Sequence, residues 1–336
     1  MKLLSFSTFD TAPLIRLGAL LGDTVIDLSS AGEWAQENRG WSSTHLPDNL
    51  MELLNLGPDA WQEARRLLHL LAGETPLELP MAGRHHVGYP LDQVSLHPPL
   101  PRPASLRDFY AFEAHVRSTF ANRGREVPPE RYQFPVFYYS NPNQVFGPAQ
   151  LLPYPSYSQA LDYELEIACV IGRAGKDIPA GEAPDHIFGY TILNDWSARD
   201  VQQAEMRAGL GPAKGKDFAA SLGPWIVTPD ELEERSTDRP GVYDLEMTAR
   251  VNGEERSRGS WKNLYYSFGE MIARASAGVF LFPGDVIGSG TVGTGCLLEL
   301  TRGKGPWLDP GDLVELEVER IGLLANQVGE RPGSPG

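Results

Sequence analysis

The chain has 336 residues, and its 44 Asp and Glu against 29 Lys and Arg give a formal net charge of −15. This length allows a large hydrophobic core, and we favour a small domain followed by a larger one over one large domain. Because no segment is rich in Lys and Arg, the sequence lacks the positive surface that binds nucleic acid, and we expect no nucleic-acid partner.

The sequence shows no sign of export or membrane insertion. The first ten residues contain one Lys and no sustained apolar stretch, unlike a signal peptide, and no window approaches the roughly 18 uninterrupted apolar residues of a membrane helix. Cys169 and Cys296 lie in apolar, strand-like runs without metal-ligand spacing, so we expect both to be reduced core residues. These features predict a soluble, cytoplasmic protein without a membrane partner.

The first part of the chain alternates short apolar runs with turn residues. The runs at 3–6, 14–21 and 24–28 predict strands. A helix is expected next, because apolar residues follow helical spacing within 61–71, and Asp59 is its candidate N-cap. Such a mixture of short strands and helices is typical of a small domain.

A proline-rich segment divides the chain. Four prolines fall within residues 98–103, a density that neither a helix nor a sheet accommodates. We therefore expect a small, β-rich N-terminal domain with helices over residues 1–97 and a larger domain over 98–328. The last residues, 329–336, are rich in Gly and Pro and are expected to form a disordered tail.

Strand-like runs separated by glycine turns dominate the larger region. Asn252-Gly253 between two such runs predicts a hairpin, and Pro-Gly-Asp turns at 283–285 and 310–312 each precede a strand. Residues 117–131 read as a charged loop. The pattern predicts an α+β protein that is mostly β, with a rolled or barrel-like β core instead of a doubly wound sheet.

The most informative segment runs from 161 to 202. Glu164 and Glu166 are two residues apart in an apolar, strand-like run, so both carboxylates leave the same face of a strand. Two neighbouring buried carboxylates repel each other unless a cation lies between them. A divalent metal bound through oxygen is one such cation.

A second polar segment follows about thirty residues later. Asp195 ends another apolar run, and residues 197–202 predict a helical turn that Ser197 or Asp195 could cap. Arg199 and Gln202, three residues apart, would share one face beside the acids. Spacing alone leaves two interpretations open, namely a metal site or a structural network of ion pairs between the acids, Arg199 and Lys216.

Several common catalytic motifs are absent. Gly215-Lys216 lacks the frame of a phosphate-binding loop, and Gly288-Ser289-Gly290 lacks the helix that a dinucleotide fingerprint requires. No Gly-x-Ser-x-Gly elbow supports a serine hydrolase. His115, taken alone, gives no catalytic signal.

Between Ser105 and Val328, four groups of motifs together resemble the fumarylacetoacetate hydrolase family: DYELEIACVIG, IFGYTILNDWSARDVQ, GKDF with GPWIVTPDEL, and PGDVIGSGT with LLEL. The resemblance implies a mixed β-roll C-terminal domain and, in the longer members, a small SH3-like N-terminal domain. It also implies a homodimer and one divalent metal, Mg²⁺ first, with Ca²⁺ or Mn²⁺ as alternatives.

The resemblance further implies roles for individual residues. Its metal ligands would be Asp108, Glu164, Glu166 and Asp195. His115 would be the general base, with Glu299 orienting it. Arg199, Gln202 and Lys216 would hold the substrate's carboxylate and its developing negative charge, and Tyr110, Thr291 and either Tyr138 or Tyr139 would contact the substrate.

The implied activity is metal-dependent hydrolysis of a carbon–carbon bond in a 1,3-diketo acid, such as fumarylacetoacetate or a related acylpyruvate, by water that His115 activates. The alternative within the family is an isomerase, hydratase or decarboxylase of 2-oxo dienoic diacids from aromatic breakdown, which needs no water-activating histidine. A third hypothesis is a non-catalytic metal-binding protein, because a fold alone does not fix a function.

Overall fold

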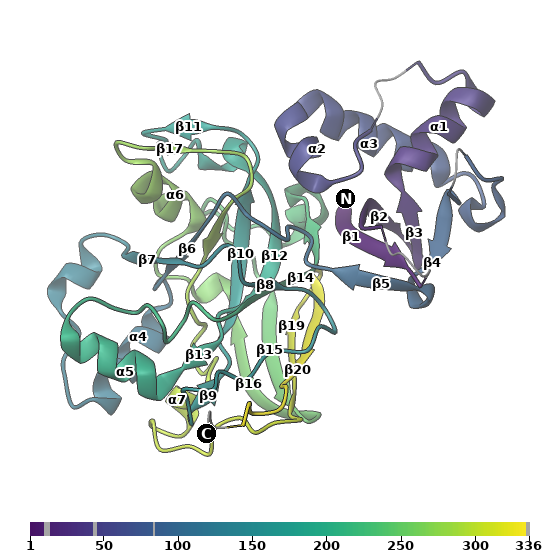
Figure 1. The fold of residues 1–336 in the computed structure, drawn as a ribbon. Coiled ribbons are helices and arrows are strands. Elements are labelled where there is room, and N and C mark those ends of the chain that lie inside the picture. Colours follow the sequence, from purple (N-terminus) through teal and green to yellow (C-terminus); the bar gives the residue numbers. More distant parts are fainter. Residues whose placement is uncertain (10–13, 43–45, 83–84, 334–336) are drawn as a thin grey trace.

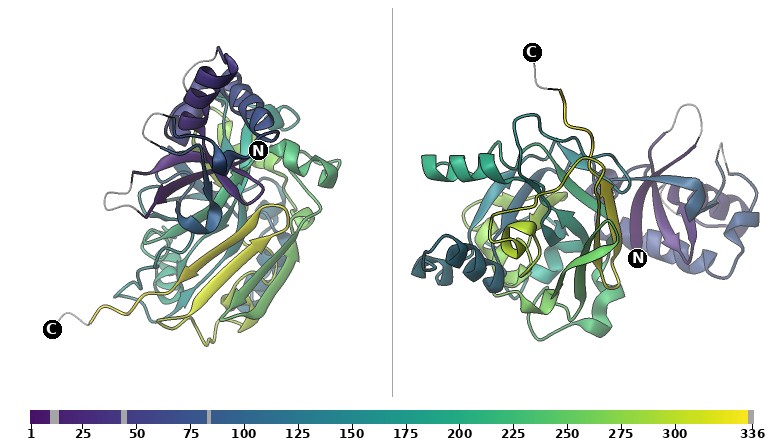
Figure 2. Two further views of the ribbon diagram at one scale, coloured as in Figure 1. Left: turned by 90° about the vertical axis from the view of Figure 1, so that its right-hand side faces the viewer. Right: turned by 90° about the horizontal axis from the view of Figure 1, so that it is seen from below.

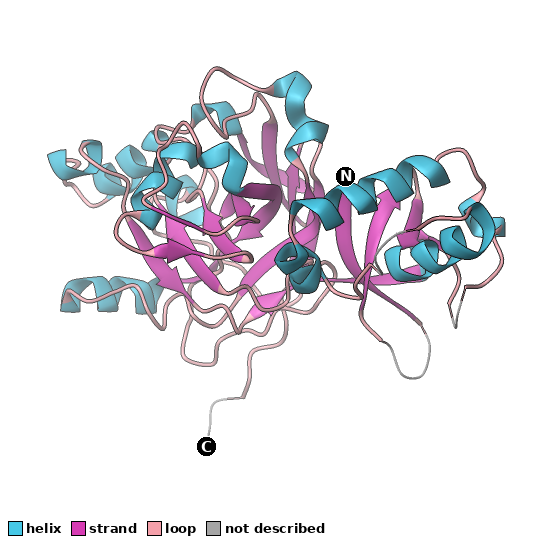
Figure 3. Cartoon of the chain, turned by 90° about the horizontal axis from the view of Figure 1, so that it is seen from above, coloured by secondary structure: helices cyan, strands magenta, loops and turns pink. Residues whose placement is uncertain are grey.

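The computed structural model describes residues 1–9, 14–42, 46–82 and 85–333 and has an α+β architecture dominated by strands (Figure 1). The described strands form a 12-stranded sheet, a four-stranded sheet and two two-stranded pairs. Figure 3 shows most helices at the periphery of this β core. The predicted fold class, α+β and mostly β, is confirmed.

The first 97 residues form one end of the 12-stranded sheet. Strands β4, β3, β2 and β1 pair in this order, β5 also pairs with β1, and all these pairs are antiparallel. The strands are β1 (Lys2–Thr8), β2 (Arg16–Leu21), β3 (Thr24–Asp27), β4 (Gly88–Pro90) and β5 (Val94–His97), and the helices are α1 (Leu28–Arg39), α2 (Leu50–Leu56) and α3 (Pro58–Leu71). The three predicted N-terminal strands are confirmed.

The same sheet continues into the larger part of the chain, because β1 also pairs with β14. From β14 the order is β12, β10, β18, β6 and β7, with β8 beside β14; β18–β6 and β14–β8 are parallel pairs, so the sheet is mixed. Their bounds are β14 (Ala220–Val227), β12 (Ile187–Asn194), β10 (Leu165–Ile171), β18 (Asp285–Gly288), β6 (Ser105–Phe109), β7 (Phe137–Ser140) and β8 (Val145–Phe146).

The four-stranded sheet is antiparallel, in the order β16-β15-β19-β20. The predicted hairpin at Asn252-Gly253 joins its first two strands, and both turn residues have positive φ, 54° and 77°, which Asn and Gly tolerate best. The predicted Pro-Gly-Asp turns precede β18 and β19. The bounds are β15 (Glu246–Val251), β16 (Glu254–Ser260), β19 (Leu313–Val318) and β20 (Gly322–Gln327).

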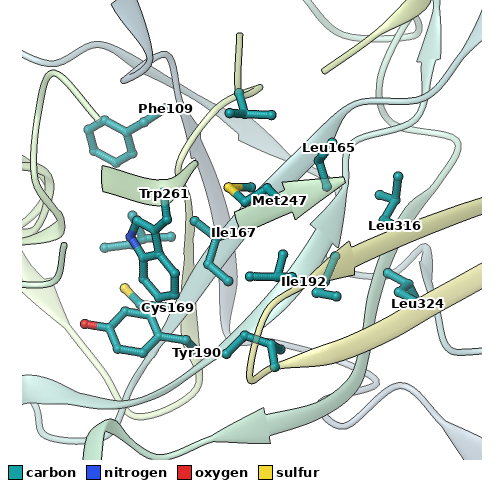
Figure 4. Packing of buried hydrophobic residues seen from close by; sticks show 14 of the residues in the cluster. Phe109, Leu165, Ile167, Cys169, Tyr190, Ile192, Met247, Trp261, Leu316 and Leu324 are labelled. Atoms are coloured by element: carbon teal, nitrogen blue, oxygen red, sulfur yellow. The ribbon is translucent and has the colours of Figure 1, made fainter. Parts of the chain in front are cut away.

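The two sheets pack face to face over the main hydrophobic core (Figure 4). Leu165 and Ile167 of β10 and Ile192 of β12 lie opposite Met247 of β15 and Leu316 of β19, and all are buried. Alternate residues of β10 point to this core, as the period of a strand requires. The strands of the four-stranded sheet, β16, β15, β19 and β20, lie side by side in green and yellow in the left view of Figure 2.

The opposite face of the large sheet is covered by the N-terminal region. Ala168 and Val170 of β10 belong to the same buried cluster as Leu53 of α2, and the ring of Trp61 in α3 meets Phe188 of β12 edge-on, with 4.9 Å between centroids. The two parts thus share a sheet and a core. The domain boundary at residue 97 and the SH3-like character of the first part stay predictions.

The remaining helices and short strands lie outside the two large sheets, with α6, β11 and β17 at the top and β9, β13 and α7 at the bottom of Figure 1. In Figure 1 and in the right view of Figure 2, α4 and α5 project on the side away from the N-terminal region. The elements are α4 (Glu113–Asn122), α5 (Arg199–Ala208), α6 (Phe268–Ser276), α7 (Leu297–Leu300), β9 (Leu161–Asp162), β11 (Gly175–Lys176), β13 (Ser197–Ala198) and β17 (Phe280–Leu281).

Three local predictions are wrong. Asp59 is not the N-cap of α3: Gly57 takes that place and Pro58 begins the helix, because its missing N–H is not needed there. Residues 117–131 are not one loop, since α4 extends through the first part and a 3₁₀ turn occupies Pro129–Tyr132. Cys296 is not in a strand but precedes α7, although both cysteines are free and buried as expected.

The C-terminal prediction is wrong in part. The backbone N–H of Gly329 donates to the carbonyl of Leu152 at 2.7 Å, and Arg331 donates to the side chain of Gln159 at 2.6 Å, so these residues are attached to the body of the protein. Residues 334–336 lie outside the described residues. None of the described helices combines the length and the apolar character needed to span a bilayer.

Candidate active site

A cavity of about 280 Å³ lies between α4, α5 and the ends of β6, β7 and β10. Ten of the twelve predicted site residues line it: Asp108, Tyr110, His115, Tyr138, Glu164, Glu166, Arg199, Gln202, Lys216 and Thr291. The other two, Asp195 and Glu299, are buried behind the wall and hydrogen-bond to lining residues. The fold therefore brings residues from six distant segments to one place.

Three buried carboxyl groups cluster at the floor of the cavity, of which those of Asp108 and Glu166 line it and that of Asp195 lies behind it. Oxygens of Asp108, Glu166 and Asp195 all lie within 4.8 Å of one another. Burial raises the pKa of Asp108, and the neighbouring carboxylate of Asp195 raises it further. Burial and the charges of Asp108 and Asp195 likewise raise the pKa of Glu166. Burial and mutual repulsion thus disfavour the simultaneous ionisation of these carboxyl groups unless a cation lies between them.

Strand geometry and one loop fix these acids. Asp108 is on β6 and Glu166 on β10, and the backbone N–H of Gly290, just after β18, donates to both carboxylates at 3.1 and 3.0 Å. A Cβ at Gly290 would lie 2.4 Å from the carbonyl oxygen of Phe109, and its φ of 77° is unfavourable for other residues. Glycine thus permits the close approach that joins the two acids.

Glu164 faces two cations. It accepts hydrogen bonds from Arg199 Nη2 at 2.7 Å and from Lys216 Nζ at 2.5 Å, and Lys216 also donates to Asp195. Although burial opposes ionisation, Arg199 and Lys216 hold the pKa of Glu164 well below its usual range. Of the four predicted metal ligands, Asp108, Glu166 and Asp195 form the cluster, whereas Glu164 forms ion pairs with Arg199 and Lys216. Both interpretations from the sequence, a metal site and a network of ion pairs, therefore have support in neighbouring residues.

Arg199 begins helix α5, where its side chain is buried. Its Nη1 donates to Gln202 Oε1 at 3.0 Å, which confirms that these residues share one face. The predicted capping by Ser197 or Asp195 is wrong, because Ala198 is the N-cap and no side chain caps the helix. Ser197 instead pairs in the two-stranded ladder of β13 and β9.

A histidine and a glutamate from two helices meet at the cavity, where the histidine lies close to Glu164. His115 of α4 and Glu299 of α7 are both buried, and Nδ1 of the histidine hydrogen-bonds to Oε1 of the glutamate. With Nδ1 engaged, Nε2 is the ring nitrogen left for other partners. The ring of Tyr110 meets His115 edge-on at 5.2 Å between centroids and restricts its orientation.

Three predicted substrate contacts are also at the cavity. Tyr138 lines it and donates to Asp195 at 2.6 Å, whereas Tyr139 is 64% exposed and packs on Arg107. This placement favours Tyr138 over Tyr139. Thr291 donates to Glu166 at 3.4 Å, and the hydroxyl of Tyr110 hydrogen-bonds to Thr119.

The donor set of the floor suits a divalent metal. Asp108, Glu166 and Asp195 offer only oxygen atoms, which Mg²⁺, Ca²⁺ and Mn²⁺ accept. Burial first, and the neighbouring carboxylates second, raise their pKa values, and a divalent cation between them would favour the ionised forms. The acidic cluster can therefore bind a metal ion, and the residues present fit one.

Two features at the site were not predicted. Asp162 is fully buried and joins Arg199 to helix α7. It precedes Glu164 and Glu166 at the same two-residue spacing, which was a usable signal. Arg131 also lines the cavity, with its guanidinium 4.4 Å from the centroid of the Tyr110 ring. No sequence pattern indicated that position.

This geometry agrees with the similarity of the chain to known proteins. The family model described as fumarylacetoacetate (FAA) hydrolase C-terminal matches residues 105–329, which include every predicted site residue. The chain belongs to the fumarylacetoacetate hydrolase family.

Relatives in this family differ in activity. The fumarylacetoacetase of Arabidopsis thaliana is 31% identical over 87% of this chain and 82% of its own length. The oxaloacetate tautomerase YisK of Bacillus subtilis is 30% identical over 97% of this chain and 100% of its own length. The crystal structure of a 5-carboxymethyl-2-hydroxymuconate delta-isomerase from Mycobacterium smegmatis aligns over 98% of this chain and 100% of that one, with 28% identity and a TM-score of 0.63. Membership of the family therefore does not choose between a hydrolase and an isomerase.

Proposed function

We propose that this protein is a metal-dependent hydrolase that cleaves a carbon–carbon bond of a 1,3-diketo acid, either fumarylacetoacetate or a related acylpyruvate. The observation that carries the proposal is the buried pair of His115 and Glu299, whose histidine lines the same cavity as Asp108 and Glu166 of the acidic cluster. Cleaving a carbon–carbon bond with water needs a base for the water and a cation for the departing enolate, and this site offers candidates for both.

The metal ligands in this proposal are Asp108, Glu166 and Asp195, with Glu164 able to join them. When bound, the metal, Mg²⁺ in the first instance, would act as a Lewis acid on the substrate's oxygens. Arg199 keeps two of its five N–H groups free of the hydrogen bonds to Asp162, Glu164 and Gln202. These two are the donors for the substrate's carboxylate.

The proton transfers are assigned to His115. Glu299 holds the Nδ1 proton, so the unprotonated Nε2 takes a proton from water and the hydroxide attacks the distal carbonyl carbon. The carbon–carbon bond then breaks, and the leaving enolate receives a proton at carbon, giving a carboxylate and a smaller keto acid. Lys216 and Gln202 stabilise the negative charge on the oxyanion and the enolate.

The test is turnover of a panel of acylpyruvates and fumarylacetoacetate, followed by loss of the diketo-enol absorbance, with Mg²⁺ and then with EDTA. Metal-dependent loss, with a keto acid and a carboxylate as products, would support the hydrolase. No turnover of any member of the panel would refute it.

A second function is supported by the full-length similarity to the oxaloacetate tautomerase. An isomerase, tautomerase, hydratase or decarboxylase of 2-oxo dienoic diacids would use the same acids, Arg199 and Lys216 to hold an enolate. It would not require water activation by His115. Conversion of such a diacid without any cleavage of acylpyruvates would favour this alternative.

The proposed setting is a homodimer in the cytoplasm whose partner in catalysis is a small diketo acid. The number of subunits is measured by light scattering during gel filtration. A monomeric mass at working concentration would contradict the homodimer.

A further inference from the structure

The geometry points to Asp162 as a positioning residue that holds the carboxylate-binding Arg199 and the helix of Glu299 in a fixed relation to each other. The inference rests on the proposed function, because it takes Glu299 as the group that orients the base. Asp162 does not line the cavity and so acts only through these two neighbours.

Three hydrogen bonds converge on the Asp162 carboxylate. Its Oδ2 accepts from Arg199 Nε at 2.8 Å and from the backbone N–H of Leu298 at 3.0 Å, and its Oδ1 accepts from the backbone N–H of Leu297 at 2.8 Å. The side chain has 0% exposure, so water does not compete for these donors. A carboxylate is an acceptor only, which suits three donors without a conflict.

These contacts join three segments that are far apart in the sequence. Asp162 lies on β9, which pairs with β13 through Ser197, and β13 leads directly into Arg199. Leu297 and Leu298 are the first residues of α7, whose N-cap, Cys296, provides no side-chain hydrogen bond. Asp162 therefore supplies from outside the acceptor that this short helix lacks.

Both neighbours are functional in the proposed reaction. On one side, Asp162 takes the Nε donor of Arg199, which leaves the two terminal nitrogens to Glu164, Gln202 and the substrate. On the other side, Leu297 is two residues before Glu299, which hydrogen-bonds to His115. A single carboxylate thus sets the distance between the group that binds the substrate and the pair that activates water.

The substitution Asp162→Asn tests this arrangement. The amide has only one accepting oxygen, so its N–H₂ group must face at least one of the three N–H donors that the carboxylate binds. We expect kcat to fall at least about tenfold and KM to rise, with the pH–rate profile shifted through His115. Asp200→Asn is the matched control: Asp200 accepts hydrogen bonds from Ser158 and from the Gln159 N–H but lies on the exposed side of α5. This control is expected to leave kcat and KM unchanged.

Measuring Asp162→Asn both in the wild-type protein and in the Glu299→Gln variant distinguishes an effect through Glu299 from a general loss of structure. If Asp162 acts through Glu299, Asp162→Asn should lower kcat less than about twofold once Glu299 is replaced, while its effect on KM through Arg199 persists. An equal loss of kcat in both backgrounds, or no loss in either, would overturn the inference.

If the Asp162→Asn protein does not fold, Leu297→Pro is a second test of the contact between Asp162 and α7. Of the three hydrogen bonds to Asp162 it removes only the one to Oδ1 at 2.8 Å, although it also replaces a buried leucine side chain. Proline is tolerated at the first position of a helix, and Cys296 before it is extended at φ −154° and ψ 159°. We expect kcat to fall and KM to stay constant, since Arg199 keeps its partner. An unchanged kcat would contradict the role of α7.

A measurement without substrate distinguishes failure of this inference from failure of the proposed function. In the wild-type protein, the His115 Nδ1 proton bound to Glu299 should give a downfield proton resonance. We expect it to shift or broaden in Asp162→Asn and to stay in place in Asp200→Asn. An unaltered resonance in Asp162→Asn would overturn the inference, whatever the activity of the protein.

Discussion

The two ends of the cavity balance their charges differently. At the end built on strands, Glu164 and Asp195 pair with Lys216, and Glu164 also pairs with Arg199. At the end built on α4 and the 3₁₀ turn, Arg123 and Arg131 line the cavity, and neither has an ion-pair partner within residues 1–9, 14–42, 46–82 and 85–333. Glu164 and Asp195 at the first end thus have cationic partners within the protein, whereas Arg123 and Arg131 at the second end have no anionic partner among those residues.

This difference separates chemistry from selectivity. The strand end places acids and cations with little freedom, because each group is buried and hydrogen-bonded. The other end depends on a turn, Pro129–Tyr132, fixed by Tyr266, which donates to the carbonyl of Arg131 at 2.9 Å. We expect changes at the strand end to abolish the reaction and changes at the other end to alter which substrates are used.

The largest effect is expected from changing the acidic cluster. Glu166→Gln removes one of three carboxylates that can hold a metal, so we expect Mg²⁺ affinity to fall at least about a hundredfold and turnover to become undetectable. Titration calorimetry with Mg²⁺ measures the affinity. Glu317→Gln, on the exposed face of β19, is the control and should bind as the wild type does. Full affinity in Glu166→Gln would show that the metal lies elsewhere.

Replacing the proposed base, His115, should lower turnover almost as much as Glu166→Gln does, but it should not change metal binding. His115→Ala removes the partner of Glu299, and we expect kcat on an acylpyruvate to fall by about 10²–10⁴-fold. Mg²⁺ affinity is measured in parallel and should not change, since His115 is outside the oxygen cluster. His186→Ala, at an exposed position, is the control. Retained activity in His115→Ala would move the assignment to the isomerase branch.

A smaller and more selective effect is expected at the other end. Arg131 lies against Tyr110 and lacks an anionic partner among the described residues, so it is suited to a second carboxylate on the acyl side of the substrate. Arg131→Gln should raise KM about tenfold for a diacid substrate and leave KM for acetylpyruvate nearly unchanged. Arg117→Gln, whose partner is Glu113, is the control. An equal rise in KM for both substrates would contradict the proposal that this end of the cavity determines which substrates are used.

The sequence predicted the strand end better than the other end for a physical reason. The period of two in a strand predicted that Glu164 and Glu166 lie on one side, and that rule is local. In the structure β10 begins at Leu165, so Glu164 directly precedes the strand, but both residues line the cavity. The resemblance to a family added His115 and Glu299, whose contact spans two helices far apart in the chain. Asp162 obeys the same period as the two acids, but its importance comes from α7, which the strand pattern does not reveal.

The position of Arg131 could not be read from its neighbours in the sequence. Its turn is held by Tyr266 and by Tyr132 against Tyr265, with 5.5 Å between the last two ring centroids. These are long-range contacts without a periodic signal. The wrongly predicted N-caps have a similar cause. Helices α3 and α5 have a glycine and an alanine at the N-cap and no side-chain capping hydrogen bond, so local capping signals did not mark where they begin.

The smallest effect concerns the stability of the metal-free protein. The pKa values of Asp108, Glu166 and Asp195 are raised in the folded state, by burial first and also by neighbouring carboxylates, although Lys216 opposes the rise at Asp195. Between its ordinary pKa and the raised value, each group binds more protons when folded than when unfolded. Stability of the metal-free protein therefore falls as pH rises from about 4 through this window.

Glu164 contributes with the opposite sign. Arg199 and Lys216 lower its pKa against the effect of burial, so its stabilisation is present above its ordinary pKa and is lost only in strong acid. We expect Mg²⁺ to raise the melting temperature by a few degrees at pH 7.5 and by less at pH 5, where protons already neutralise part of the cluster. In Glu166→Gln this dependence on Mg²⁺ should be much reduced. A Mg²⁺ effect that is equal at both pH values would show that the charge of the three acids is already compensated within the protein.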